Sequence, residues 1–299
     1  MAPEVSVVVP AYNASRTIER CVESLLALSE NSPSREIIIV DNGSDDGTEE
    51  IVRKHPGITL VEEKTVRGPS AARNAGVRAA VGGIIAFTDA DCVAAPDWLV
   101  HGVRPLGDPA VCGVAGIIRG VEPKNEVQEW MNSRNILDAK AALANPFRPY
   151  AQTANAFFRR EDFWKVSGFD TALPYGEDCD FSWRILEATK GRLELAPDAL
   201  VCHDHRCSVR GLFRQSAKNA GASAYLAAKW GDALPAKYWK VSVWECLDLA
   251  RSGLHFAGVS LAGKSGADRM NAKLDFLHRL GRKKGMIASA WHTGQYGRW

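Results

Sequence analysis

The stretch GGIIAFTDADC, residues 82–92, ends an apolar run with Asp89 and Asp91, two acidic residues separated by one alanine. Such a run is typical of a strand buried on both faces of a sheet. Because side chains alternate along a strand, both carboxylates are expected on the same side, where their like charges repel. A hard divalent cation such as Mg²⁺ or Mn²⁺ would offset this repulsion. The alternative is a pair of solvated loop residues, since about one D-x-D pair is expected by chance in a chain of this length.

Strand and helix patterns alternate on the N-terminal side of this stretch. Continuous apolar, β-branched runs indicate strands, and apolar residues three and four positions apart indicate helices. The strands are expected at 5–13, 36–44, 58–62 and 82–91, and the helices from Ser15, at 45–55 and at 69–81. This βαβα order predicts a mostly parallel sheet with helices on both faces.

In three of these four predicted strands, polar residues follow directly after the apolar run. They are Tyr12 and Asn13, Asp41 and Asn42, and Asp89 and Asp91. In open sheets of this kind, ligands bind beyond the carboxyl ends of the strands. We therefore expect the three polar groups to converge on one crevice.

The pattern is less regular after Cys92. We expect a short helix from Pro96, a strand at 111–120, a helix over 124–144, a strand at 153–160, a short helix within 161–169, a helix with an acidic start within 174–188, and two short strands within 192–203. From Ser208 onward helical patterns dominate.

Five short motifs occur in a fixed order along this framework. They are PAYN at 10–13, VDNGS at 40–44, ARNAG at 72–76, TDADC at 88–92 and GEDCDF at 176–181. With these motifs the sequence resembles a family-2 glycosyltransferase of the GT-A fold, an inverting enzyme that uses a nucleotide-sugar. The resemblance covers about residues 4–210. It implies an α/β fold with a Rossmann-like mixed, mostly parallel sheet and flanking helices.

The resemblance also implies a division of the chain. The GT-A domain would comprise residues 1–208, with a nucleotide-binding half at 1–92 and an acceptor half at 93–208. A helical C-terminal extension would comprise residues 209–299.

Several residues match positions that bind the donor in this family. Ala11 and Tyr12 match the loop that borders the nucleotide base, and Asp41 matches the carboxylate that hydrogen-bonds the base. An ionised carboxylate only accepts hydrogen bonds, which suits the ring N–H of uracil or guanine and hence a UDP- or GDP-sugar. The alternative for Asp41 is a turn-forming residue before Gly43.

The ARNAG segment matches the part of the family that lies near the base and the diphosphate. Arg73 would contact these groups, and Gly68 and Gly76 would allow close approach of the backbone. The alternative for Arg73 is a surface helix residue with an acidic partner four positions away, but neither position 69 nor position 77 is acidic.

The D-x-D aspartates match the metal site of the family. Asp91 would bind Mg²⁺ or Mn²⁺ directly, Asp89 would lie nearer the ribose, and His203 matches a further metal ligand of some GT-A enzymes. The metal would offset the charge that builds up on the leaving nucleoside diphosphate. A zinc site that includes Cys202 and His205 is the alternative, but its spacing matches no familiar zinc motif.

Asp178, in GEDCDF, matches the general base of the family. An inverting transfer needs one carboxylate that takes the proton from the acceptor hydroxyl on the face opposite the leaving group. Glu177 and Asp180 are the nearest competitors. The structural alternative is that residues 177–180 only cap a helix.

The charge of the chain is distributed unevenly. Residues 209–299 contain 15 Lys and Arg against 5 Asp and Glu, although the net charge of the whole chain is only +2. This segment also holds five of the nine tryptophans and the basic run HRLGRKKG at 278–285. Basic helices with interleaved aromatic residues favour anionic membrane surfaces. The alternative is a solvated helical appendage that packs on the catalytic domain.

The longest candidate for a membrane span, residues 241–262, is interrupted by Glu245, Asp248 and Arg251. No basic and apolar leader pattern is visible at the N-terminus. We therefore expect a cytoplasmic protein that attaches peripherally to the inner face of the plasma membrane.

The expected function is metal-assisted inverting transfer of a sugar, of hexosyltransferase type, to a glycan or lipid-linked acceptor in polysaccharide or glycolipid synthesis. No nucleic-acid partner is expected. A nucleotidyltransferase is one alternative, but it would need a glycine- and lysine-rich loop that residues 10–21 lack. A non-catalytic nucleotide-sugar-binding protein is another, although such a protein would be expected to have lost Asp91 or Asp178.

Overall fold

The chain divides into two compact units. The structure is a computed structural model that describes residues 2–231 and 243–294. The first unit comprises Met1–Val121, Leu137–Ala172 and Glu177–Asp204, and the second comprises Glu122–Ile136, Leu173–Gly176 and His205–Trp299. The two short internal segments of the second unit carry no signal in the sequence. The last junction, at residues 204 and 205, lies near the boundary that we propose at residue 208.

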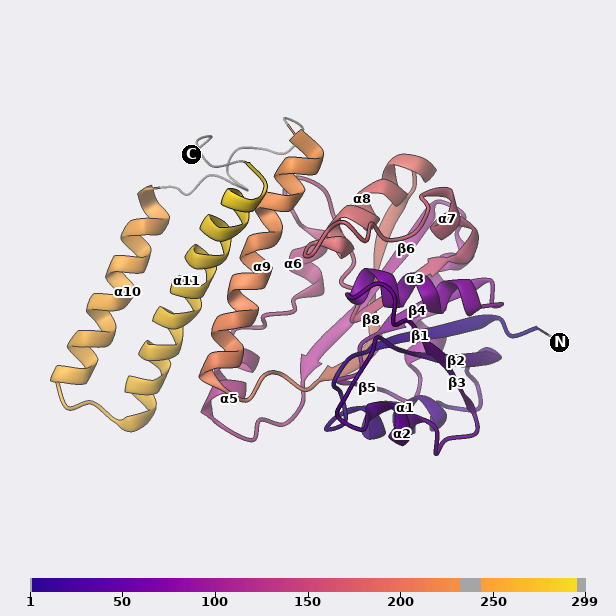
Figure 1. Cartoon of the computed structure of the whole chain (residues 1–299), viewed down its shortest axis with the longest axis horizontal. Helices are drawn as coiled ribbons and strands as arrows, with labels where there is room; N and C mark the ends of the chain where they lie inside the picture. Colours follow the sequence, from indigo (N-terminus) through magenta and orange to yellow (C-terminus); the bar gives the residue numbers. More distant parts are fainter. Residues whose placement is uncertain (1, 232–242, 295–299) are drawn as a thin grey trace. The chain divides into compact units, whose positions relative to one another are not determined.

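The first unit is built on an eight-stranded sheet with the order β3-β2-β1-β4-β7-β6-β8-β5 (Figure 1). The strands are β1 (Val5–Ala11), β2 (Arg35–Asp41), β3 (Ile58–Glu62), β4 (Ile84–Thr88), β5 (Cys92–Ala94), β6 (Val111–Gly120), β7 (Asn155–Arg159) and β8 (Arg192–His203). The four strands at one side, β3, β2, β1 and β4, are parallel to one another. Beyond them β7 is antiparallel to β4 and β6, β6 and β8 are parallel, and β5 is antiparallel to β8. The predicted GT-A type of mixed, mostly parallel sheet is therefore confirmed.

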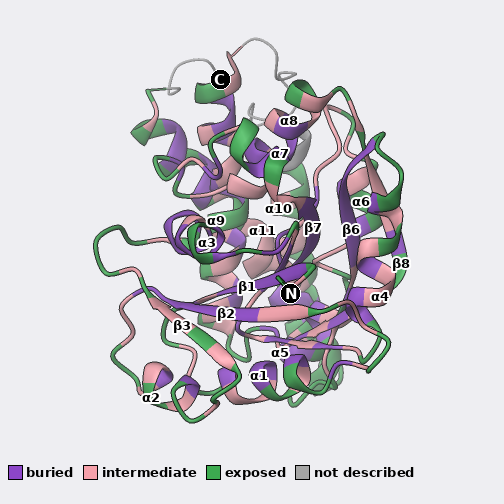
Figure 2. Cartoon of the chain, turned by 90° about the vertical axis from the view of Figure 1, so that its right-hand side faces the viewer, coloured by how far each residue is buried: buried purple, intermediate pink, exposed green. Residues whose placement is uncertain are grey.

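Helices cover both faces of this sheet, as the βαβα order predicts. The helices of the first unit are α1 (Ile18–Leu26), α2 (Thr48–Val52), α3 (Pro69–Ala79), α4 (Trp98–Val103), η1 (Arg104–Gly107), α6 (Ala139–Leu143), α7 (Arg160–Lys165) and α8 (Glu177–Thr189). Alternate residues of β1 lie in different apolar clusters, because side chains alternate along a strand. Val7 and Val9 pack with Leu25 of α1, whereas Val8 packs with Ala72 of α3. Figure 2 shows the strands as mainly buried between exposed outer helix surfaces.

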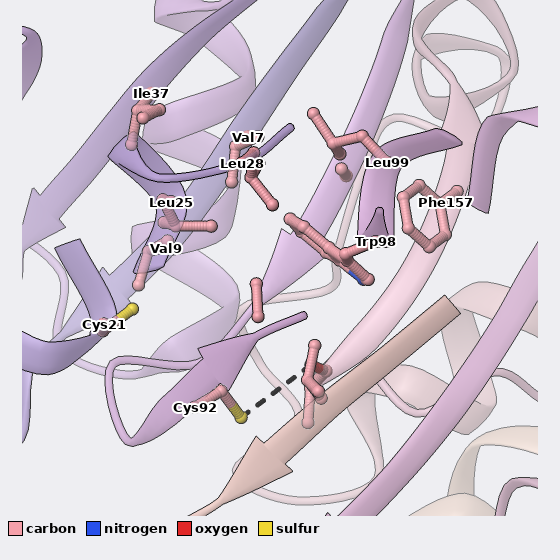
Figure 3. Packing of buried hydrophobic residues seen from close by; sticks show 14 of the residues in the cluster. Val7, Val9, Cys21, Leu25, Leu28, Ile37, Cys92, Trp98, Leu99 and Phe157 are labelled. Atoms are coloured by element: carbon pink, nitrogen blue, oxygen red, sulfur yellow. Dashed lines mark hydrogen bonds between the residues drawn. The ribbon is translucent and has the colours of Figure 1, made fainter. Parts of the chain in front are cut away.

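The cluster on the α1 side continues across the sheet to α4 (Figure 3). Trp98 and Phe157 lie at its centre with ring centroids 5.2 Å apart, and both are fully buried. The indole Nε1 of Trp98 donates to Oδ1 of Asn155 at 2.8 Å, so its polar atom is satisfied inside the core. This packing fixes the positions of the strands. The candidate site lies at their carboxyl ends.

Two sequence-based expectations differ from the structure. The helix predicted over 124–144 is two helices, α5 (Glu126–Ser133) and α6, because Asn135 has a positive φ of 44° and Asp138 caps a new helix with its side chain. The two strands predicted within 192–203 are one strand, β8. Its register with β6 jumps from Ala196 to Leu200, around Pro197, which has no N–H to donate to a ladder.

The second unit is helical. Its helices are α5, α9 (Val209–Trp230), α10 (Val243–Leu261) and α11 (Gly266–His292). Helices α9 and α11 pack closely at small residues: a Cβ on Gly285 would overlap the backbone of Ala217, and one on Gly221 would lie 2.5 Å from Oγ of Ser289. Trp130 of α5 donates from Nε1 to Asp275 of α11 at 3.1 Å. Within the described residues, none of the helices combines the length and apolarity needed to cross a membrane.

Candidate active site

Asp41 ends β2 and is almost completely buried. Its Oδ2 atom accepts the N–H groups of Gly43 at 2.9 Å and Ser44 at 3.0 Å, which is the turn-forming role that the sequence left open. Its Oδ1 atom is also buried, and no donor for it lies among the described residues. A buried carboxylate oxygen normally accepts a hydrogen bond. Asp41 thus holds the turn with one oxygen, and its other oxygen has no hydrogen-bond donor among the described residues.

Tyr12 lies beside this turn and is 60% exposed. The guanidinium of Arg67 lies 5.5 Å from the centroid of the Tyr12 ring and donates to the carbonyl oxygens of Asn42 and Gly43. Gly68 follows with a φ of 121°, a backbone conformation that favours glycine, and its N–H donates to Oδ1 of Asn42 at 2.7 Å. The loop before α3 is thus bound to the turn after β2. Gly76, by contrast, serves packing, because a Cβ there would overlap the side chain of Val8.

Arg73 is buried in α3 and links two other elements. Its Nη2 atom donates to Oδ1 of Asp89, just after β4, at 2.8 Å, and its Nη1 atom donates to Oε1 of Glu177, at the start of α8, at 3.1 Å. Burial opposes the charge of the guanidinium, but the two carboxylates outweigh it and raise the pKa of Arg73 above its usual value. The alternative of a surface helix residue is therefore wrong. The carboxylate of Asp89 is therefore paired with the guanidinium of Arg73.

Asp91 lies next to His203, which ends β8. Oδ1 of Asp91 is 3.3 Å from Nε2 of His203, and both side chains are largely buried. The pairing of β5 with β8 places them together, because Cys92 is opposite His203 in the ladder and the N–H of Asp204 donates to the carbonyl of Asp91 at 2.8 Å. The two aspartates of the D-x-D pair therefore have different partners, which reduces their mutual repulsion.

The Asp91–His203 pair fits a divalent metal in its chemistry. A carboxylate oxygen and an imidazole nitrogen are both ligands that Mn²⁺ accepts, whereas Mg²⁺ prefers oxygen ligands alone. Across residues 2–231 and 243–294, no group of three or more His, Cys, Asp or Glu side chains could hold a metal ion by itself. Such a pair matches a metal that takes its other ligands from phosphate and water. The zinc cluster considered from the sequence does not form within the described residues.

The first turn of α8 contains three carboxylates with different surroundings. Glu177 is bonded to Arg73, and Asp180, fully buried, accepts from Nε of Arg184 at 2.8 Å. Asp178 forms no ion pair within the described residues. Its Oδ1 accepts the N–H of Cys179 at 2.8 Å, and the thiol of Cys179 also bonds to this carboxylate. Burial, followed by the negative charge of Glu177, raises the pKa of Asp178 to about 7. A carboxylate with that pKa suits proton transfer near neutral pH.

Residues 6–167 match the family model described as Glycosyl transferase family 2. The chain belongs to glycosyl transferase family 2. It is 34% identical over 237 residues to the pre-mycofactocin glycosyltransferase of Mycobacterium tuberculosis, covering 77% of this chain and 48% of that protein. It is 31% identical over 209 residues to glycosyltransferase AglE of Haloferax volcanii, covering 68% of each. The chain thus spans about half the length of the mycobacterial relative.

A solved structure is similar to this family-2 chain over almost its whole length. It is the mannosyltransferase PcManGT from Pyrobaculum calidifontis in complex with GDP-Man and Mn²⁺. The two structures have a TM-score of 0.66 and 25% sequence identity, and the match covers 98% of this chain and 87% of that one. The resemblance to the family that the five motifs indicate is therefore confirmed.

The family membership leaves the roles of single residues as predictions, but the structure shows which of them lie together. Arg73 joins Asp89 to the turn of α8 that carries Asp178, and Asp91 lies against His203. Sequence reasoning missed the partners Arg67 and Glu177, because bonds across the fold leave no local pattern. It also missed Arg184, although its spacing of four residues from Asp180 is the local pattern of a helix ion pair.

Proposed function

We propose that this family-2 protein transfers a sugar from a nucleoside diphosphate-sugar to an acceptor hydroxyl with inversion at the sugar carbon. The observation that carries the proposal is the distribution of partners at the start of α8. Glu177 and Asp180 are each bonded to an arginine, whereas Asp178 is half-buried beside them without one in the described structure and has a raised pKa. An inverting transfer requires one such carboxylate and no covalent nucleophile.

The donor is proposed to be a UDP- or GDP-sugar, and Ala11, Tyr12, Asp41, Gly68, Arg73 and Asp89 are proposed to bind it. Asp41 supports this assignment, because its buried Oδ1 has no donor among the described residues and would accept the ring N–H of uracil or guanine. Tyr12 and Arg67 would border the base. Asp89, oriented by Arg73, would accept from a ribose hydroxyl.

Asp91 and His203 are proposed to hold Mn²⁺ or Mg²⁺, with the pair of oxygen and nitrogen ligands favouring Mn²⁺. A bound divalent cation would supply a positive charge to the diphosphate as the glycosidic bond breaks. Arg73 would add a second positive charge close by. Asp178 would take the proton of the acceptor hydroxyl.

The acceptor is proposed to be a glycan or lipid-linked molecule of cell-surface synthesis, reached at the inner face of the plasma membrane. The excess of basic residues over 209–299 supports association with an anionic membrane surface. The basic run HRLGRKKG at 278–285 does not supply one continuous patch: Arg279 pairs with Asp248, Lys284 lies over the ring of Phe213, and Gly281 and Gly285 are buried.

A thermal-shift screen tests the proposal. UDP-, GDP- and dTDP-sugars are added with Mn²⁺ or Mg²⁺, and the expected result is stabilisation by a UDP- or GDP-sugar that depends on the metal. A transfer assay with the stabilising donor then separates an enzyme from a non-catalytic binding protein. Stabilisation by none of the donors with either metal would contradict the proposed nucleotide-sugar site.

A further inference from the structure

Helix α10 has a stripe of leucines on one side. Leu247, Leu254 and Leu261 recur every seven residues, so they lie in line along the helix. They are 44%, 74% and 89% exposed. Ala250 and Ala257, which are also exposed, lie between them at helical spacing. The outer face of α10 is defined here by these three leucines and two alanines.

The opposite side of α10 packs on α11. The rings of Phe256 and Phe276 stack with centroids 6.4 Å apart at an angle of 14°, and Val259 is buried on the same side. Asp248 also points to α11, where it pairs with Arg279. Figure 1 shows α11 between α9 and α10, so the outer face of α10 is directed away from both. Helix α10 is therefore apolar on two sides, and the described part of the chain covers one of them.

Basic residues border the outer face of α10. Arg251 lies four residues after Leu247 and three before Leu254, and it is exposed. At the turn that follows the helix, residues 262–269 are all exposed and include Lys264 and Arg269. Among the described side chains nearby, Asp248 pairs with Arg279, and Asp268, which accepts a hydrogen bond from the neutral Ser265, offsets one of the three positive charges. The border of the outer face therefore carries a net positive charge.

This charge selects among the partners that could cover the leucines. A second copy of the chain would bring two segments together that each contain 15 Lys and Arg against 5 Asp and Glu, which opposes association. An anionic lipid surface has the complementary charge. Leucines on one side of a helix can enter the boundary between headgroups and acyl chains, while Lys and Arg at the border extend to the phosphates.

We propose that the outer face of α10 lies in the interface of an anionic membrane, with the helix axis parallel to the surface and Arg251, Lys264 and Arg269 in contact with lipid phosphates. The inference rests on the membrane association proposed above and gives it a defined surface. It places the membrane contact on α10 and not on the basic run at residues 278–285. The charged residues of α10 argue against a helix that spans the membrane, but not against one that lies on its surface.

Vesicle sedimentation with the full chain tests this surface. The vesicles contain phosphatidylcholine alone or with phosphatidylglycerol. The test variant is Leu254→Ser/Leu261→Ser, and its matched control is Leu26→Ser/Val81→Ser, which changes two leucine- or valine-sized side chains that are 42% and 53% exposed in the first unit. A charge variant, Lys264→Gln/Arg269→Gln, is measured beside them, and Leu261→Ser alone replaces the double variant if that one does not fold.

The wild type and the control are expected to bind the anionic vesicles and not the neutral ones. The leucine variant should bind roughly tenfold more weakly, since it loses apolar area that the bilayer buries. The charge variant should lose about fivefold or more, and its binding should respond less to salt.

Four results would overturn the inference. The first is equal vesicle binding by the leucine variant and the wild type. The second is a wild-type dimer in analytical ultracentrifugation that the leucine variant abolishes, which would identify a second copy as the partner. The third is a large loss of thermal stability in the leucine variant without loss of vesicle binding, which would mean that the chain itself covers the face. Failure of the wild type to bind any vesicle would reject membrane association altogether, while the transfer assay decides the proposed chemistry separately.

Discussion

The start of α8 is acidic and helix α10 is largely apolar. In each helix, one residue has an ion-pair or ring-stacking partner among the described residues and a chemically similar residue two positions earlier does not. In α8, Asp180 is bonded to Arg184, and Asp178 two residues earlier has no ion pair in the described structure. In α10, Phe256 stacks on α11, and Leu254 two residues earlier is exposed. The members of the first pair are both aspartates and those of the second are both apolar, so their chemical class does not distinguish them. The difference in partners does, and it indicates which group is left for a ligand.

The largest effect is expected at Asp178. Asp178→Asn removes the proposed base, so kcat should fall by about 10²–10⁴-fold, while the affinity for the nucleotide-sugar stays within a factor of about two. Steady-state transfer kinetics and donor titration measure the two quantities. A variant with wild-type kcat would show that another group takes the proton.

Asp180→Asn should produce the opposite result, a loss of stability. It leaves Arg184, which is only partly exposed, without its buried carboxylate, and such a change costs about 3–5 kcal/mol. Urea unfolding measures this difference. If Asp180→Asn is as stable as the wild type but inactive, the roles of the two aspartates are reversed.

His203→Ala should weaken the response to metal. Loss of the imidazole beside Asp91 should raise the Mn²⁺ concentration needed for half-maximal activity by roughly tenfold or more, because even indirect partners of metal ligands contribute 10–100-fold. Mn²⁺ titration of nucleoside diphosphate binding provides a second readout. The control is His55→Ala. His55 follows α2 and pairs with Glu19 of α1, so this change should leave the titration unchanged.

The pH dependence should follow Asp178. Because transfer requires the ionised carboxylate, kcat/KM should rise with pH through about 7 and level off above it. The free energy of unfolding should change with pH in the opposite direction. A carboxyl with a raised folded-state pKa stabilises the fold most below its unfolded pKa and loses that contribution as the pH rises to about 7. Asp178→Asn should therefore be more stable than the wild type at pH 8, which thermal unfolding at two pH values can check.

The smallest effect is expected at Leu261. Leu261→Ser removes a side chain that is 89% exposed, so the free energy of unfolding should change by less than about 0.5 kcal/mol in the absence of lipid. Phe256→Ala, on the opposite side of the same helix, should lower stability clearly more. Equal losses in the two variants would mean that both sides of α10 are packed.

The fold was largely predictable because the first four strands are continuous apolar runs that end in polar residues. The break before α6 was missed, although Asn135, which has a positive φ, and Asp138, which caps the new helix, are residue types that favour helix ends and helix starts. In the site, motif order gave the positions of Asp41, Asp91 and Asp178. The partners of these groups were not predictable, because Arg73 reaches Glu177 from 104 residues away and nothing local records that bond. Likewise, the pattern of α10 shows two apolar sides but not which side α11 covers.

The two hydrogen bonds that Arg73 donates, one to Asp89 and one to Glu177, limit how the site can vary. One guanidinium donates to both Asp89 and Glu177, and its single positive charge offsets only one of the two negative charges, so loss of Arg73 would leave both carboxylates unpaired in a largely buried setting. Loss of either carboxylate alone would still leave Arg73 with one partner. Among relatives, we therefore expect Arg73 to be replaced only together with Asp89 and Glu177, whereas efforts to change the donor preference can alter Asp89 while Glu177 keeps Arg73 paired.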